Sequence, residues 1–382
     1  MIEALALCAQ AGVPVLLWGP PGVGKTATVT ALARGLDLPI EVVIASIREP
    51  SDFAGLPVVR DGQGVVLEPP LWAKRLAREG RGLLFCDELS TAPPAVQAAL
   101  LRVVLERAVG DLLLPPEVVV VAAANPPDQT ASGWELSAPL ANRFVHLTWE
   151  VDAARWADGL VAGWPAAAVP RLPAEWRQGL PKHRALVAAF LRTRPQLLSA
   201  MPAEESQRGG AWPSPRSWTM TADLLAACEA VSQDGSQEAA LVSGCVGAGA
   251  SGEFLSWRQA LDLPDPESLL AKPEQFQLPK RGDRQYAILG SVVAAVLSRL
   301  TPQRWAAGWQ IVSRAAEQGG ADVAAVYALS LLERRKQQPT LQISADQLRP
   351  LLPVLQEAGL LAEPRDDHAI LRQAQDERGG RG

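Results

Sequence analysis

The stretch GPPGVGKT carries the strongest chemical signal in this 382-residue chain. It has the pattern G-x-x-x-x-G-K-[ST], follows the apolar run VPVLLW and opens a helical pattern. Glycines let backbone N–H groups curl around phosphate oxygens, and the helix N-terminus adds its dipole. The stretch predicts a nucleotide phosphate site, in which the lysine reaches the β and γ phosphates and the threonine hydroxyl contacts Mg²⁺; the alternative is a flexible turn. Its residues are Gly19, Pro20, Pro21, Gly22, Val23, Gly24, Lys25 and Thr26.

A second candidate is the acidic pair Asp87 and Glu88, which ends the apolar run GLLFC. Such a pair is common by chance, but downstream of a phosphate loop each carboxylate acquires its own role. We expect Asp87 to hold Mg²⁺ through water and Glu88 to polarise the attacking water as general base. Adjacent side chains on a strand point to opposite faces, so only the end of the strand lets both approach one nucleotide.

Two further polar residues stand at the borders of predicted strands. Asn125 ends EVVVVAAAN, at a carboxyl tip where ligands bind in open parallel sheets, and its amide could hold a water or the γ phosphate without adding charge. The alternative is an asparagine that begins a turn before proline. Arg143 precedes the last apolar run. It could form a structural salt bridge or act as an arginine finger on the γ phosphate of a neighbouring subunit.

Arg216 lies in AWPSPRSW, far along the chain from these motifs. With Ser214 as N-cap and Pro215 as first helical residue, Arg216 is a cation at the positive end of a helix dipole, which is unfavourable. A bound γ phosphate would reverse the effect, because the guanidinium and the helix N-terminus both attract it. The alternative is an exposed arginine in a solvated turn. Whether Arg216 acts within its own subunit or across an interface stays open.

These residues need a scaffold, and the first 150 residues supply alternating apolar and helical patterns. Runs rich in Val, Ile and Leu without polar alternation, separated by helices, predict a parallel sheet covered on both faces. The expected fold class is an α/β P-loop NTPase core. The predicted strands are VPVLLW, IEVVIAS, GLLFCDE, EVVVVAAAN and RFVHLTW, and the predicted helices between them are KTATVTALARGL, LWAKRLAREG and PPAVQAALLRVVLERA.

After about Glu150 the strand-like runs largely vanish, and segments with apolar residues at helical spacing take over. We therefore expect the α/β core over residues 1–152, an all-helical lid over 153–300, and a C-terminal helical extension over 301–382. The end of the chain, RDDHAILRQAQDERGGRG, is polar enough to be frayed or disordered.

Composition limits the partners and the setting. The net charge is −5, whereas a general nucleic-acid surface needs a basic excess, so no nucleic-acid partner is expected, although local basic patches stay possible. Apolar runs such as ILGSVVAAVL are well short of the roughly 18 residues of a membrane span, and no basic residue precedes Lys25 as in a secretory signal. The four cysteines show no paired spacing that would indicate disulfides or zinc. We expect a soluble cytoplasmic protein without membrane insertion.

In this order, GPPGVGKT, LLFCDE, AAANPP and LANRF resemble the motifs of the AAA+ ATPases. The segments REPSDFAGLPV, DELSTAPPAVQAALLRVVLE and PSPRSW narrow the resemblance to the MoxR-type group, over roughly residues 1–300. No motif of the group matches beyond about residue 300. Residue by residue, the resemblance implies Walker A at residues 19–26, Walker B at Asp87 and Glu88, sensor 1 at Asn125, the arginine finger at Arg143 and sensor 2 at Arg216.

The resemblance also implies a function. MoxR-type proteins typically form hexameric rings with nucleotide between subunits. They act as chaperone-like motors, often with a partner that carries a von Willebrand factor A domain, in maturing other proteins or inserting their metal cofactors. For this chain the resemblance implies hydrolysis of ATP to ADP and phosphate with Mg²⁺, a homo-oligomeric and hexameric ring, a von Willebrand factor A domain partner and a protein client.

The same group interrupts the second helix of its core with an insert that faces the ring axis. Here AGLPVVRDGQGVVLE, within about residues 53–69, has two short apolar runs around RDGQG, with Asp61 and Gly62 as a hairpin turn. The segment lies between IEVVIAS and LWAKRLAREG, where such an insert is expected. The alternative is an ordinary surface hairpin.

Two other functions stay open. A motor on the same core could act on nucleic acid, as a helicase or a restriction translocase. The negative net charge and the lack of a recognisable DNA-binding module disfavour it. A nucleotide-gated scaffold could bind ATP with little turnover, which the presence of Glu88, Asn125, Arg143 and Arg216 disfavours.

Overall fold

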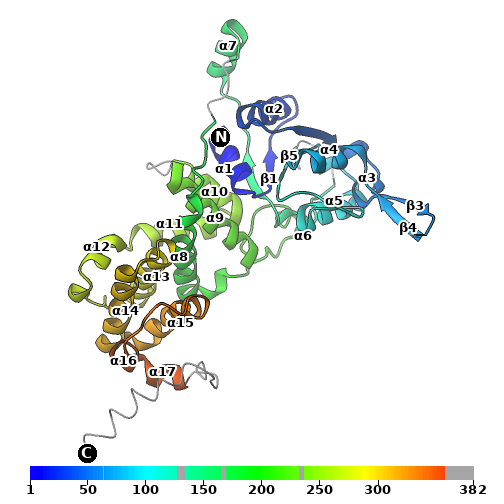
Figure 1. The fold of residues 1–382 in the computed structure, drawn as a ribbon. Helices are drawn as coiled ribbons and strands as arrows, with labels where there is room; N and C mark the ends of the chain where they lie inside the picture. The colour runs from blue at the N-terminus through cyan, green and yellow to red at the C-terminus, as the bar shows by residue number, and fades with distance from the viewer. Residues whose placement is uncertain (63, 127–128, 130–133, 165–168, 232–235, 358–382) are drawn as a thin grey trace, which may run out of the picture. The chain divides into compact units, whose positions relative to one another are not determined.

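The structure, a computed structural model, describes residues 1–62, 64–126, 129, 134–164, 169–231 and 236–357. The chain divides into two compact units. The first comprises Met1–Trp176 and Gln196–Leu255, and the second comprises Arg177–Pro195 and Ser256–Gly382. Figure 1 shows the order of the elements along the chain.

A five-stranded parallel sheet forms the core of the first unit. Its order is β2-β5-β8-β1-β9, and all five runs that the sequence predicts as strands take part in it. Because parallel strands end at one edge of a sheet, the residues that follow them meet there. The strands are β1 (Val15–Trp18), β2 (Ile40–Ile44), β5 (Arg81–Asp87), β8 (Glu117–Ala124) and β9 (Val145–Thr148).

Helices flank the sheet, and further helices follow it along the chain. The three predicted between the strands form where expected, and those that begin at residues 2 and 238 have no counterpart among the predicted elements. The helices of the first unit are α1 (Ile2–Ala11), α2 (Lys25–Leu36), α3 (Ser51–Ala54), α4 (Leu71–Glu79), α5 (Pro94–Glu106), α6 (Ala138–Ala141), α7 (Ala153–Ala162), α9 (Pro215–Val231) and α10 (Glu238–Val246), with short turns η1 (Ala45–Ile47), η2 (Leu89–Thr91) and η6 (Glu205–Gln207).

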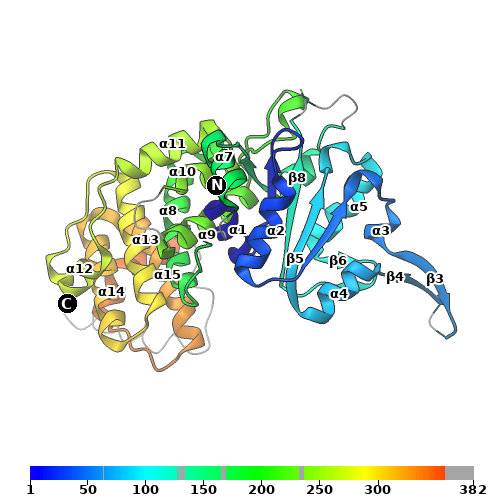
Figure 2. The same cartoon turned by 90° about the horizontal axis from the view of Figure 1, so that it is seen from above.

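Both faces of the middle of the sheet are covered. Figure 2 shows α2 on one side of β5 and β8 and α5 on the other. Leu84 of β5 and Ala122 of β8 pack in one buried cluster with Leu100 of α5. The predicted cover is incomplete on β2, where Val42 and Ile44 are 44% and 39% exposed, because β2 is an edge strand.

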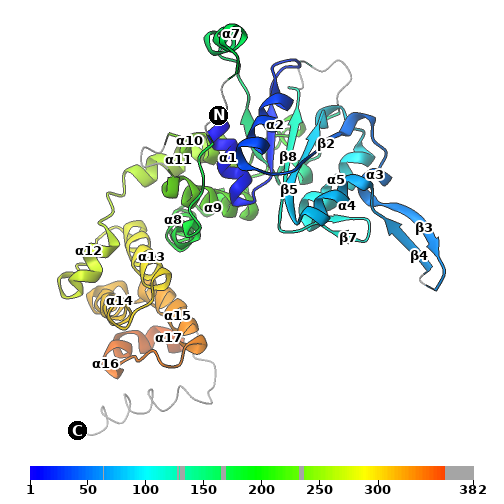
Figure 3. The ribbon, with the colours of Figure 1, turned by 45° about the horizontal axis from the view of Figure 1, so that its top comes forward.

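The segment predicted as an insert forms a hairpin. Its strands β3 (Leu56–Arg60) and β4 (Gly64–Glu68) pair antiparallel. Asp61 and Gly62 form a turn, as predicted, and Gly62 takes a φ of +74°, a conformation that favours glycine. Gln63 lies outside the described residues. Figure 3 shows the hairpin projecting beyond α3.

A shorter hairpin, which was not predicted from the sequence, is hydrogen-bonded to the base of the first hairpin. Its strands are β6 (Ala108–Val109) and β7 (Leu112–Leu113). Between them the backbone N–H of Asp111 donates to the carbonyl of Leu67 at 3.0 Å, and the Asp111 carboxylate accepts from the N–H of Leu67 at 2.8 Å. A Cβ at Gly110 would lie 2.3 Å from the Leu67 carbonyl oxygen, so this close approach requires glycine.

The second unit is helical throughout its described residues, as predicted. Its core gathers the buried side chains of Val292, Trp305, Trp309 and Leu331. The polar tail predicted at the end of the chain lies outside the described residues. The elements are α8 (Leu180–Thr193), α12 (Pro266–Ala271), α13 (Gly282–Ser298), α14 (Pro302–Ala315), α15 (Ala321–Gln337), α16 (Ala345–Leu348) and α17 (Leu352–Glu357), with short turns η4 (Trp176–Gly179), η5 (Pro195–Leu197), η7 (Pro273–Gln275), η8 (Ala316–Gly320) and η9 (Arg349–Leu351); α11 (Ala248–Gln259) begins in the first unit.

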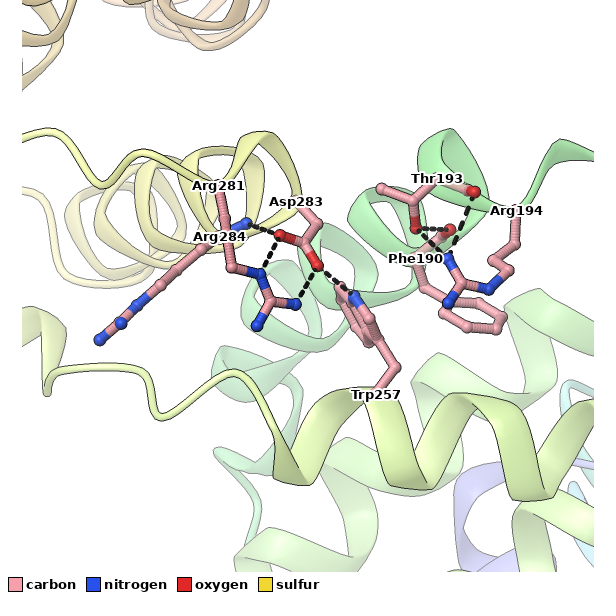
Figure 4. A network of polar contacts seen from close by, with 7 residues as sticks. All are labelled: Phe190, Thr193, Arg194, Trp257, Arg281, Asp283 and Arg284. Carbon is pink, nitrogen blue, oxygen red and sulfur yellow. Dashed lines mark hydrogen bonds and ion pairs between the residues drawn. The ribbon is translucent and has the colours of Figure 1, made fainter.

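A partly buried carboxylate organises the start of α13 (Figure 4). Asp283 accepts hydrogen bonds from the Trp257 indole at 2.9 Å, from the Arg281 guanidinium at 2.7 and 3.2 Å, and from the backbone N–H of Arg284 at 2.8 Å. Burial would raise the pKa of Asp283, but the hydrogen bonds from Arg281 and Trp257 outweigh it and hold the pKa below its usual value.

None of the helices formed by the described residues combines the length and the apolar character that crossing a bilayer requires.

Candidate nucleotide site

The predicted phosphate loop connects β1 to α2, and Lys25 is the first residue of that helix. Gly22 and Gly24 take φ angles of +77° and +88°, which side chains rarely adopt. A Cβ at either position would meet no atom within 4 Å. Glycine is therefore required here by backbone conformation, and the space beside both residues is open enough for a ligand.

The Lys25 ammonium lies inside the loop, and the residue is only 8% exposed. Its Nζ donates to the carbonyl oxygens of Gly19 at 2.6 Å and Pro20 at 2.9 Å, and to Oδ1 of Asn125 at 2.8 Å. Burial lowers the pKa of Lys25, and the charge of Asp87 opposes that shift. Since these three acceptors are neutral, an anion beside Lys25 would stabilise its charged form, which suits a phosphate group.

Thr26 and Asp87 meet at the same edge of the sheet. The Thr26 hydroxyl donates to Oδ2 of Asp87 at 2.7 Å, and Oδ1 of Asp87 accepts from the backbone N–H of Glu88 at 2.9 Å. Hydroxyl and carboxylate oxygens are the ligands that Mg²⁺ prefers, and Mg²⁺ keeps several of its waters. The pair therefore supplies the kind of oxygen atoms that the predicted magnesium site needs.

Glu88 stands just beyond the end of β5 in a left-handed conformation, with a φ of +56°. This turn gives the chain the change of direction that lets Asp87 and Glu88 serve one site. The Glu88 carboxylate accepts a hydrogen bond from the hydroxyl of Ser46, in the turn that follows β2. Sequence reasoning missed Ser46; its signal is its position as the last residue of the predicted strand IEVVIAS.

Asn125 follows β8 and faces the loop. Its Oδ1 accepts a hydrogen bond from the Lys25 ammonium, and its backbone N–H donates to the hydroxyl of Ser90 at 3.1 Å. Ser90 is 5% exposed and lies two residues after Glu88. This bond connects the end of β8 to the turn that carries Glu88. The same bond gives the buried hydroxyl of Ser90, which no sequence motif singled out, a hydrogen-bond partner.

Arg143 and Arg216 are close enough for their charges to interact. Burial and the charge of Arg216 lower the pKa of Arg143. The Arg143 guanidinium donates to the Pro139 carbonyl, and its Nε is buried without a hydrogen-bond partner. Among the described residues no carboxylate forms an ion pair with either arginine, so the predicted alternative of a structural salt bridge at Arg143 does not occur there. Two adjacent guanidiniums without a carboxylate make an attractive place for an anion.

A buried polar network joins the two segments that carry these arginines. Ser214 caps α9 as predicted: its hydroxyl accepts from the N–H of Ser217 at 3.1 Å, and Pro215 and Arg216 are the first two helical residues. The Ser214 hydroxyl also donates to Oδ1 of Asn142 at 2.6 Å, and Nδ2 of Asn142 donates to the Trp212 carbonyl at 2.9 Å. Asn142, which the sequence analysis did not select, thereby ties the turn of Arg143 to the start of α9.

The predicted site residues thus fall into two groups. No hydrogen bond or ion pair between described residues joins one group to the other. The loop group contains Gly19, Pro20, Pro21, Gly22, Val23, Gly24, Lys25, Thr26, Asp87, Glu88 and Asn125, and the arginine group contains Arg143 and Arg216.

Comparisons with known proteins agree with this geometry. Residues 14–144 match the family described as AAA domain (dynein-related subfamily). Denitrification regulatory protein NirQ of Pseudomonas aeruginosa is 30% identical over 170 residues, which are 42% of this chain and 64% of NirQ. ATPase family gene 2 protein homolog B of Homo sapiens is 36% identical over 137 residues, 33% of this chain and 16% of that protein. The chain therefore spans less than two thirds of either relative.

Among solved structures, one from Cytophaga hutchinsonii ATCC 33406 aligns with 71% of this chain and 88% of its own, with a TM-score of 0.39 and 20% identity. The family match, the strand order and the phosphate loop after β1, followed by a helical C-terminal region, define the fold as that of an AAA+ P-loop NTPase. Within that class, residues 14–144 carry the pattern of the dynein-related AAA domains.

Proposed function

We propose that this chain is an ATP-hydrolysing, MoxR-type AAA+ motor subunit of a homo-hexameric ring. The ring would remodel or mature a client protein complex together with a von Willebrand factor A domain partner, with metal-cofactor insertion as one form of that work. The observation that most supports this proposal is the arrangement of the loop group. It brings a buried lysine, a threonine and carboxylate pair for Mg²⁺ and a second carboxylate to one edge of the sheet.

Each residue of the loop group has a chemical task in this proposal. Bound ATP with Mg²⁺ would supply the phosphoanhydride whose hydrolysis releases energy. The loop N–H groups and Lys25 would hold the phosphates, while Thr26 and Asp87 would hold the metal. The Glu88 carboxylate would exchange its Ser46 hydrogen bond for a water and accept that water's proton. Asn125 would orient the water or the γ phosphate beside Lys25.

The arginine group supports a site shared between subunits. Arg143 and Arg216 lie together and without a link to the loop group of the same chain. We propose that both act on the γ phosphate held by a neighbouring subunit. In this arrangement an arginine finger at Arg143 would bring Arg216 to the same phosphate of the neighbouring subunit.

The test is a trap variant, Glu88→Gln. It should bind ATP with nearly wild-type affinity but hydrolyse it at least about 100-fold more slowly, because the amide cannot accept a proton. Binding is measured by calorimetry and hydrolysis by phosphate release. Glu106→Gln, which removes only an exposed ion pair with Arg102, is the matched control and should behave as wild type. Wild-type turnover of Glu88→Gln would assign the general base to another residue.

The same variant tests the partner. With ATP present, tagged Glu88→Gln should retain a von Willebrand factor A domain protein that Lys25→Ala does not retain. Retention of DNA or RNA, together with ATP hydrolysis stimulated by nucleic acid, would instead support the nucleic-acid motor. A wild-type ring that binds ATP without measurable turnover would support the nucleotide-gated scaffold.

A further inference from the structure

Trp149, the first residue after β9, lies against the phosphate loop. Its indole Nε1 donates to the carbonyl oxygen of Val23 at 3.1 Å. Its backbone N–H donates to the carbonyl of Trp18 at 2.6 Å, which extends the pairing of β9 with β1 by one residue. Trp149 therefore touches both the start and the middle of the segment that holds the proposed phosphates.

The approach of Trp149 also explains the first glycine of the loop. A Cβ at Gly19 would lie 3.0 Å from the Trp149 carbonyl oxygen and 3.3 Å from its Cβ. Those contacts are closer than ordinary van der Waals distances. Gly19 is not among the glycines with positive φ, so crowding by Trp149, and not backbone conformation, disfavours a side chain here.

A second contact from β9 fixes the residue that precedes the loop. The Trp18 indole donates to Nδ1 of His146 at 2.9 Å, and the two rings stack with centroids 6.0 Å apart. Since Nδ1 accepts, the imidazole proton sits on Nε2, which donates to the Ala141 carbonyl at 2.9 Å. Burial lowers the pKa of His146 to about 4, so this neutral form persists at neutral pH.

We propose that Trp149 is a positioning residue that sets the direction of the Gly24 N–H. A planar trans peptide holds its C=O and N–H groups in opposite directions. The indole draws the Val23 carbonyl toward Trp149, so the N–H of the same peptide unit, which belongs to Gly24, points to the opposite side of the loop. This inference rests on the proposed function, in which loop N–H groups bind phosphate oxygens.

The loop needs such a constraint because it is rich in glycine. Gly22 and Gly24 flank Val23, and glycine has the largest backbone freedom to lose on ordering. Without the indole hydrogen bond, the peptide unit between Val23 and Gly24 can rotate, and nucleotide binding must then order it. A single hydrogen bond of ordinary strength corresponds to a loss of about three- to tenfold in affinity.

The experiment compares Trp149→Phe with wild type, both as the full chain. In Trp149→Phe, the Kd for ADP with Mg²⁺, measured by calorimetry, should rise about three- to tenfold. Amide hydrogen exchange over residues 22–26 should accelerate in the nucleotide-free protein. The KM for ATP should rise similarly while kcat changes less than about twofold. The control is Trp305→Phe, which removes a matched indole bond of 2.8 Å to the Gln342 carbonyl in the second unit and should leave the Kd unchanged.

Unchanged Kd and unchanged exchange in Trp149→Phe would overturn the proposal, and so would a lowered melting temperature without any change in Kd. If Trp149→Phe does not fold, benzothienylalanine at position 149 keeps the shape of the ring and removes only the N–H. The Kd and the amide exchange of that variant then test the proposal in the same way. Failure of the wild-type protein to bind ADP with Mg²⁺ would contradict the proposed function instead, so the two failures are distinguishable.

Discussion

At the scale of single residues, the site depends on one buried cation. Lys25 donates hydrogen bonds to three neutral oxygens. The charge of Asp87 opposes the lowering of the Lys25 pKa by burial. Burying an ammonium without a directly bonded carboxylate is unfavourable, and the lowered pKa of Lys25 reflects that. A phosphate beside it would remove the penalty. This balance fits the proposed role of Lys25 in binding a phosphate better than a role in stabilising the fold.

The corresponding prediction concerns Lys25→Ala. ATP affinity should fall at least about 100-fold, since a charge-assisted contact to phosphate is lost in a water-poor loop. The melting temperature should not fall, because the variant also removes a buried charge. Lys74→Ala, which breaks only an exposed ion pair with Glu68, serves as the control in the same titration. Equal ATP affinities for Lys25→Ala and wild type would mean that the loop is not a phosphate site.

At the scale of elements, the start of α13 shows how one carboxylate can organise a helix. Asp283 stands in the first turn, where a negative charge also suits the helix dipole. Its four hydrogen bonds join Trp257 of α11 to the residues around the helix start (Figure 4). Since the pKa of Asp283 is lowered in the folded state, its contribution to stability is full above the unfolded-state pKa of about 3.9.

We therefore expect Asp283→Asn to lower the free energy of unfolding at pH 7 by about 1 to 3 kcal/mol, because hydrogen bonds to a charged group are lost. The difference between variant and wild type should shrink as the pH falls below about 4, since Asp283 of the unfolded chain is then protonated, and it should be lost once the pH falls below the lowered pKa of the folded state. Urea unfolding followed by helical circular dichroism measures both. Asp346→Asn, at an exposed ion pair with Arg349, should change little. A difference that stays constant down to pH 2 would contradict the role of charge.

At the scale of the whole molecule, the arginine group makes a prediction about assembly. The buried hydrogen bond between Asn142 and Ser214 joins the turn that carries Arg143 to the helix start that carries Arg216, so the two arginines should move and act as a unit. If both reach the nucleotide of a neighbouring subunit, each active site combines the loop group of one chain with the arginine group of the next. A single chain would then be a poor ATPase by itself.

Mixing inactive variants tests this. Lys25→Ala mixed with Arg143→Ala should recover part of the ATPase activity, because some interfaces pair an intact loop with intact arginines. Arg143→Ala mixed with Arg216→Ala should recover none, because every interface lacks one arginine. Recovery in that second mixture would show that Arg216 acts on its own subunit's nucleotide while Arg143 acts across the interface. Phosphate release by the reassembled mixtures is the measurement.

Much of the fold could be predicted because its signals are local. The five strands of the sheet are unbroken apolar runs, and α2, α4 and α5 have helical spacing and lie between them. The N-cap of α9 was predicted from serine and proline alone, and it forms as expected. The helices α1 and α10 were missed, and so was the hairpin β6–β7, whose two-residue strands are too short to show a pattern.

By itself, the sequence determined the fold class and the residues of the loop group, because glycine spacing and strand-end carboxylates are contiguous patterns with a direct physical meaning. The tertiary structure alone decided which residues meet. Ser46 reaches Glu88 from another strand, Asn142 connects Arg143 to the start of α9, and Trp149 turns its indole to Val23. These pairs are separated by 42, 72 and 126 positions. Nothing local marks such contacts, since sheet order and helix packing bring their partners together.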